Sequence, residues 1–226
     1  ISYQIVSKKL KSIIKELDET NNIKILFEKI IKSNGDIDNE SFLKTIDKNI
    51  NGKSIIECIT FCHKIHVPVF FNILKTVNNS EPSEHIVYID IKSSCGLQNK
   101  NNYTSNKRNN KLVAKKYMEC IENVFNELCI KDSKAMAKKV FELEKNMTLN
   151  YEERHDDVLE SISNFCKNKH FKFKYAKYFK NIGINSNKKI YFESRKYTKW
   201  IDSIIKKEGK IENYDVLYYY IVYHLA

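Results

Sequence analysis

The sequence predicts a mainly α-helical protein with one small β element. Only five glycines and two prolines occur among 226 residues, which is too few for an all-β or a disordered chain. Most segments repeat apolar residues every three or four positions, which is the spacing of one helical face. One stretch, HVPVFFNILKTVNNSEPSEHIVYIDIKSSCGL at residues 66–97, instead alternates apolar and polar residues around a polar turn. We therefore expect a multi-helical fold with a small β-hairpin.

Four helices are expected before the hairpin, because apolar residues recur at helical spacing over residues 6–17, 23–31, 42–46 and 56–63. Asn34-Gly35 ends the second of them. The fourth begins with Ser54-Ile55-Ile56-Glu57, a capping box in which the serine and glutamate side chains bond each other's backbone N–H groups. It is expected to end near His66.

The hairpin follows at once. Pro68 lacks the N–H that a helix interior needs, so the preceding helix is finished before it. Alternation starts at Val69, turns at residues 78–83 and resumes up to Ile91. Two strands alone are marginal in water, so the hairpin must lie on helices. We expect Phe71 to be buried, and Phe71→Asp to unfold the domain.

Residues 93–110 are polar and are expected to form a long exposed loop. Apolar periodicity then predicts helices over residues 113–128, 133–147, 173–179, 197–205 and 214–225. Asp132-Ser133 is expected to cap the second of these, and Gly209 to close the fourth. A short strand is expected at residues 190–192. The chain shows no internal repeat and no clear domain boundary.

The net charge of +11 is compatible with nucleic-acid binding, but lysines occur along the whole chain and greatly outnumber arginines. We interpret the charge as a background of composition. Six cysteines show no disulfide framework spacing, so their pairing stays open. Sequons start at Asn39, Asn78, Asn102 and Asn146, and they permit a secretory location without indicating it. No apolar run reaches the length of a membrane span.

Two groups of residues have the composition of a metal site. His63 and His66 have helical spacing, with Cys58 and Cys62 in the preceding turns, and both residue types bind zinc. No glutamate stands in the register of a zinc-protease helix, so a helix end with partly buried His and Cys is the preferred interpretation.

The second group, Asp36, Asp38 and Glu40, resembles the start of a calcium loop, but Ser41 replaces the required glycine. A solvated loop is preferred there.

An acidic cluster surrounds Arg154 and His155 and consists of Glu152, Glu153, Asp156 and Asp157. Such clusters at helix starts usually face solvent and the helix dipole. The sequence contains no G-x-S-x-G, no phosphate-binding glycine loop and no H-E-x-x-H. We therefore assign no catalytic, cofactor-binding or metal-ligating residue, and we expect this chain to be inactive alone.

The order of segments nevertheless resembles the N-terminal region of the neprilysin and endothelin-converting-enzyme family of zinc metallopeptidases, most clearly from Ser54 onward. The matching elements are the capped helix leading into HKIHVPVFFNI, the strand Val87-Tyr88-Ile89-Asp90, Gly96-Leu97, the V-x-x-L-E pattern at residues 140–144, Glu152-Glu153-Arg154, FKFKYAKYFKNIGI, KKIYFESRKYTKWIDSII and the last helix, ENYDVLYYYIVYHLA. The proline that follows Gly-Leu in the family is missing, with Gln98 in its place, and the arginine of the last helix is replaced around His224.

The resemblance implies one N-terminal domain over residues 1–226, whose first 53 residues lie outside the clearest part of the match. In the family, two histidines of H-E-x-x-H and a downstream glutamate hold zinc in the C-terminal half. The resemblance thus implies a non-catalytic region that encloses the active-site cavity of an endopeptidase acting on peptides, or a standalone remnant of one. Its partner would be the catalytic half, its location secreted or external to a membrane, and zinc would sit outside this chain.

A function of another class stays open. A basic helical module could bind nucleic acid or an acidic protein through its lysines. Binding to random duplex with a steep salt dependence would favour it. The sequence begins with Ile, so we expect it to be a piece of a longer protein.

Overall fold

The computed structural model describes residues 39–90, 95–97, 99–151, 159–167, 173–192, 195–207, 210–212 and 215–226. The chain divides after Phe42 into two compact units, and all described elements except the first residues of α3 belong to the second unit. The helices predicted at residues 6–17 and 23–31 lie outside the described residues, as does Gly209. The expectation of a single domain over residues 1–226 stays a prediction.

Two predicted helices open the described part. They are α3 (Asn39–Asn49) and α4 (Ile55–Lys64). The capping box of α4 is confirmed, since the Ser54 N–H donates to Glu57 Oε2 at 2.9 Å and the Glu57 N–H donates to Ser54 Oγ at 3.4 Å. The end of α4 near His66 is confirmed as well.

The chain next forms a buried kink where a strand had been predicted. Val69, Phe70 and Phe71 are all at most 1% exposed, and alternation cannot bury three successive side chains on one face of a sheet. Phe70 has a left-handed φ of 63°. Its N–H donates to the Tyr220 hydroxyl at 2.9 Å, and its carbonyl accepts from the Tyr197 hydroxyl. The strand therefore starts later than predicted, at Asn72.

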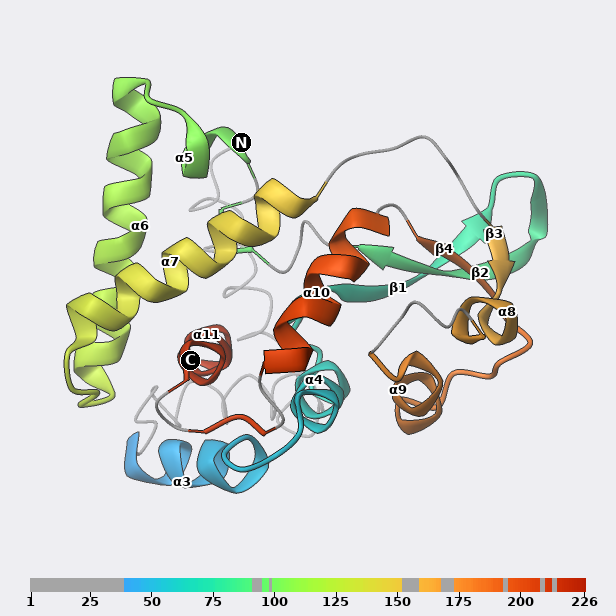
Figure 1. Cartoon of the computed structure of the whole chain (residues 1–226), viewed down its shortest axis with the longest axis horizontal. Coiled ribbons are helices and arrows are strands. Elements are labelled where there is room, and N and C mark those ends of the chain that lie inside the picture. Colours follow the sequence, from blue (N-terminus) through green and yellow to red (C-terminus); the bar gives the residue numbers. More distant parts are fainter. Residues whose placement is uncertain are drawn as a thin grey trace, which may run out of the picture. The chain divides into compact units, whose positions relative to one another are not determined.

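The hairpin itself is confirmed, and it is part of a larger sheet. β1 (Asn72–Asn78) pairs antiparallel with β2 (Glu81–Asp90), with a tighter turn than expected. β4 (Lys189–Phe192) pairs parallel to β2, and β3 (Leu159–Ser161) pairs antiparallel to β4. The strand order is β1-β2-β4-β3 (Figure 1). β4 stands where predicted, whereas β3 is too short to produce a sequence pattern.

The predicted loop at residues 93–110 is wrong in part. It contains α5 (Asn101–Thr104), which buries Tyr103, and Cys95 is buried too. The predicted helical hairpin follows as α6 (Arg108–Glu127) and α7 (Ser133–Asn150), and Figure 1 shows α7 running obliquely back from the turn that joins the two helices. α7 starts at the predicted residue for another reason, because Asp132 adopts a left-handed φ of 56° and its side chain makes no capping bond.

Four more helices complete the described part: α8 (Ile162–Cys166), α9 (Tyr175–Asn181), α10 (Arg195–Lys207) and α11 (Val216–Leu225). All but α8 were predicted. The fold class is thus confirmed as mainly α with a small sheet. Within the described ranges, no helix is both long and apolar enough to cross a bilayer.

Candidate functional site

His63 has a structural role in α4. Its Nε2 lies 3.2 Å from the Val69 carbonyl, to which it can only donate, so Nδ1 accepts from the Tyr178 hydroxyl. The ring also makes an edge contact with Phe71 at 5.1 Å. Burial lowers the pKa of His63 to about 4, so the ring is neutral at pH 7. Both nitrogens are therefore occupied by the protein.

The other members of the predicted H-x-x-H group do not gather around His63. His66 is exposed, lies beyond the end of α4 and has a left-handed φ of 62°. Cys58 and Cys62 are buried thiols whose pKa burial raises to about 12. In the part of the chain that the structure describes, no three His, Cys, Asp or Glu side chains are placed to hold a metal ion.

The remaining sequence candidates fall into two sets. Asp36, Asp38 and the cluster at residues 152–157 lie outside the described residues, whereas Glu40 is exposed on α3. Among the sequons, Asn78 is buried, and its amide donates to Glu84 at 2.8 Å. None of the six cysteines, all of which the structure describes, forms a disulfide.

A buried carboxylate that sequence reasoning did not single out joins four segments. Glu144 on α7 is fully buried. Its Oε2 accepts from the Tyr103 hydroxyl at 2.7 Å, and its Oε1 lies 3.0 Å from the Tyr117 hydroxyl and 2.8 Å from His224 Nε2. Burial and then the charge of Glu144 raise the pKa of both tyrosines, so they stay protonated donors. We call these four residues the Glu144 cluster.

The chain before α5 is packed against this cluster. The Leu97 N–H donates to the Tyr103 hydroxyl at 2.9 Å. A Cβ at Gly96 would lie 1.9 Å from the Tyr117 hydroxyl oxygen, so only glycine fits there. The chemistry of the cluster is that of a joint between α5, α6, α7 and α11. Glu144 is the final residue of the V-x-x-L-E pattern, which thereby acquires a physical role.

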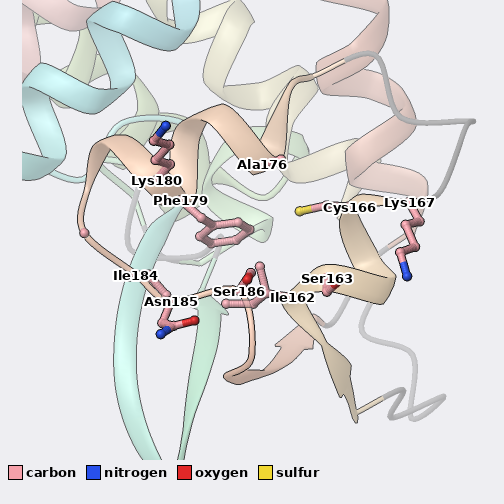
Figure 2. Close-up of a pocket in the computed structure, with 11 residues that line it drawn as sticks. Ile162, Ser163, Cys166, Lys167, Ala176, Phe179, Lys180, Ile184, Asn185 and Ser186 are labelled. Carbon is pink, nitrogen blue, oxygen red and sulfur yellow. The ribbon is translucent and has the colours of Figure 1, made fainter.

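A hollow that could receive a ligand lies between α8, α9 and the chain after α9. This α8–α9 pocket has a volume of about 690 Å³, within the range of ligand sites. Figure 2 shows the Phe179 ring and the Cys166 sulfur directed into it, with Ile162 and Ile184 beside them. Burial, with a smaller effect of Glu160, raises the pKa of Cys166 to about 11, so this thiol is a poor nucleophile.

The walls of the pocket are fixed by backbone hydrogen bonds. The Ser163 N–H donates to the Ser186 carbonyl at 2.9 Å, which ties α8 to the chain after α9. α9 ends in a Schellman motif: Gly183 has a φ of 79°, and the Ile184 N–H donates to the Phe179 carbonyl at 2.9 Å. This motif brings Ile184 against Phe179. The pocket is therefore a preformed part of the fold.

The pocket lies in the most basic part of the sequence. Residues 161–192 contain eight lysines and no Asp or Glu, so they carry +8 of the net charge of +11. Our interpretation of the charge as evenly spread background is therefore wrong for this stretch. Counting acidic residues in successive windows would have found it.

Comparisons with known proteins agree with one another. The model of the N-terminal region of peptidase family M13 matches residues 5–226. The fold is similar to that of the Mycobacterium tuberculosis zinc metalloprotease Zmp1 in complex with an inhibitor, with a TM-score of 0.67 and 13% identity over 96% of this chain. For Zmp1 in its open state, the TM-score is 0.61, with 13% identity over 82% of this chain. The matched regions are 36% and 29% of the Zmp1 chains. A search of curated protein sequences gives no significant match.

Proposed function

Because the chain belongs to peptidase family M13, we propose that it is the non-catalytic N-terminal region of a zinc endopeptidase and helps to enclose the cavity in which peptides are cleaved. The observation that carries this proposal is the family match over residues 5–226. The fold likeness to about a third of Zmp1 supports it. We propose that residues 1–226 act as one domain, with no catalytic or metal-ligating residue among them.

The described residues do not fit a zinc site. The two nitrogens of His63 are used by Tyr178 and Val69, and the described ranges bring no third metal ligand together with a pair of others. The zinc of the family would thus be held by the catalytic region, which we propose as the partner of this chain. A secreted or membrane-external location is part of the same proposal.

The first experiment compares residues 1–226 alone with the native polypeptide. The intact mass of the native polypeptide, with peptide mapping beyond Ala226, shows whether a catalytic region is attached. We expect a longer chain that binds zinc and cleaves a fluorogenic peptide, whereas residues 1–226 do neither. Zinc-dependent hydrolysis by residues 1–226, or a native chain ending at Ala226, would overturn the proposal.

The enclosing role has its own test. The native polypeptide should cleave a short peptide much faster than the same sequence displayed on a large folded carrier, because an enclosed cavity admits only small substrates. Equal cleavage of both substrates would remove the enclosing role and leave the family membership untouched.

A further inference from the structure

The α8–α9 pocket has features that the proposed function does not use. Its base is formed by Ile162 and Phe179, which are each 1% exposed, and half-buried Ile184 beside them offers apolar surface that a ligand can reach. Ala176 also lines the hollow and is exposed. An apolar hollow of about 690 Å³ on fixed backbone has room for a large side chain and the chain on either side of it.

The surroundings of the hollow are positively charged. Lys167 and Lys180 line it, and Figure 2 shows them extending from it in different directions. Within the described part of the chain, neither lysine has an ion-pair partner. By contrast, Lys189 at the start of β4 lies 2.8 Å from Glu84.

These two features together select one kind of ligand. We infer that the α8–α9 pocket is a docking site for an acidic segment of a partner polypeptide, which inserts an apolar side chain between Lys167 and Lys180. Exposed Ala176 and half-buried Ile184 contribute apolar surface for an inserted side chain to bury, and the lysines favour approach of acidic residues. This inference is independent of the proposed peptidase role.

A nucleic acid fits the same surface less well. Residues 161–192 contain no arginine, the residue that pairs best with phosphates and base edges. Phe179, the aromatic residue of the lining, is 1% exposed, so its ring face is not available for base stacking. A phosphate backbone also has no apolar group with which to fill the floor.

The test uses residues 1–226 and a fluorescein-labelled peptide, EDEELFEDED, measured by fluorescence anisotropy. We expect saturable binding that weakens as salt rises. Replacing LF by AA in the peptide should weaken binding at least about tenfold, because the apolar anchor is lost. Amide shifts in a ¹⁵N NMR spectrum should map to residues 162–167 and 176–186.

Protein variants locate the contact. Ala176→Trp should fill the pocket and weaken binding at least about tenfold, whereas Ala135→Trp at an exposed position of α7 should change it less than about twofold. The double variant Lys167→Glu/Lys180→Glu should weaken it similarly, and the matched double variant Lys134→Glu/Lys138→Glu on α7 much less. Because Lys167 and Lys180 are exposed, their variants stay informative even where Ala176→Trp fails to fold.

Three outcomes would overturn the inference. One is no binding of the peptide at millimolar protein. Another is equal affinity for the LF and AA peptides, which would leave only diffuse charge attraction. The third is tighter binding of a twelve-nucleotide single-stranded DNA that displaces the peptide, which would make the surface a nucleic-acid interface.

Discussion

The Glu144 cluster and the α8–α9 pocket differ in how their polar and charged groups are paired. Glu144 is fully buried, and three side chains from α5, α6 and α11 reach its two oxygens. At the pocket, Ala176 and half-buried Ile184 present apolar surface to solvent, and Lys167 and Lys180 lack ion-pair partners among the described residues. The polar groups of the Glu144 cluster find their hydrogen-bond partners within the protein. The charge and apolar surface of the α8–α9 pocket are instead suited to a ligand from outside.

We expect the Glu144 cluster to contribute to the stability of the fold and the α8–α9 pocket to contribute to binding. A buried carboxylate is tolerated only when its hydrogen-bonding capacity is met, so the Glu144 cluster is a condition for folding. An open apolar hollow with a basic rim adds little to stability and is retained at the cost of solvent-exposed apolar surface. Substitutions at interior positions should therefore change the free energy of unfolding strongly, whereas substitutions at the pocket should change it little.

Phe71→Asp should have the largest effect. The Phe71 ring is 1% exposed and lies 5.4 Å from the ring of Tyr178, on the interior side of α9. A carboxylate at this position would lose its hydration, so we expect a loss above about 4 kcal/mol and no cooperative unfolding transition. Leu74→Asp, at a position 40% exposed on β1, is the control and should cost less than about 1 kcal/mol. Unchanged stability of Phe71→Asp would contradict the buried position.

Glu144→Leu should come next. It leaves the hydroxyls of Tyr103 and Tyr117 without their acceptor inside the protein, so we expect a loss of about 3–5 kcal/mol in urea unfolding. Glu142→Leu on the same helix removes only an exposed ion pair with Lys145 at 3.2 Å. It should change stability by less than about 1 kcal/mol. Equal effects of the two variants would mean that the cluster does not depend on its carboxylate.

His63 should make stability depend on pH. Its folded pKa is about 4 against an ordinary 6.5, so the unfolded chain takes up the proton first as pH falls. The contribution of the neutral ring is complete above about pH 6.5 and is lost progressively down to about pH 4, by up to about 3 kcal/mol. His63→Gln should be less stable at pH 7 and should lack this part of the slope. Parallel pH profiles for both proteins would show that the ring does not titrate this way.

Ala176→Trp should have the smallest effect on stability. The side chain at this exposed position extends into open space, so we expect a change below about 1 kcal/mol, mostly from helix propensity. Thermal unfolding measures this change alongside the peptide binding, which the same variant should weaken at least about tenfold. A loss above about 2 kcal/mol would mean that the hollow is filled by packing, which would remove the contrast between the two regions.

The sequence predicts the long helices well because their apolar spacing extends over many turns, as in α6 and α7. It fails where short segments depend on distant ones. The backbone of Phe70 is held by Tyr197 and Tyr220, more than a hundred residues away, and this turns a predicted strand into a kink. β3 has three residues, and its place is set by pairing with β4.

The two regions differ in how far the sequence reveals them. Glu144 stands in a quoted pattern, but its partners come from three other segments, so its burial was not predictable. The basic stretch at residues 161–192 is visible in the sequence alone. The hollow is not, because the turn at Gly183 and the bond between Ser163 and Ser186 create it only in the folded chain.

Because β2 pairs in parallel with β4, the sheet can be completed only late in the synthesis of the chain. Val87 pairs with Ile190, so the ribosome must add about a hundred residues before the open edge of β2 is covered. At 5–20 residues per second, this delay is roughly 5–20 s. During that time the nascent hairpin presents unpaired backbone groups to other chains, the usual start of edge-to-edge aggregation. Slower translation would lengthen this interval, and rapid chaperone capture of the nascent chain would protect it.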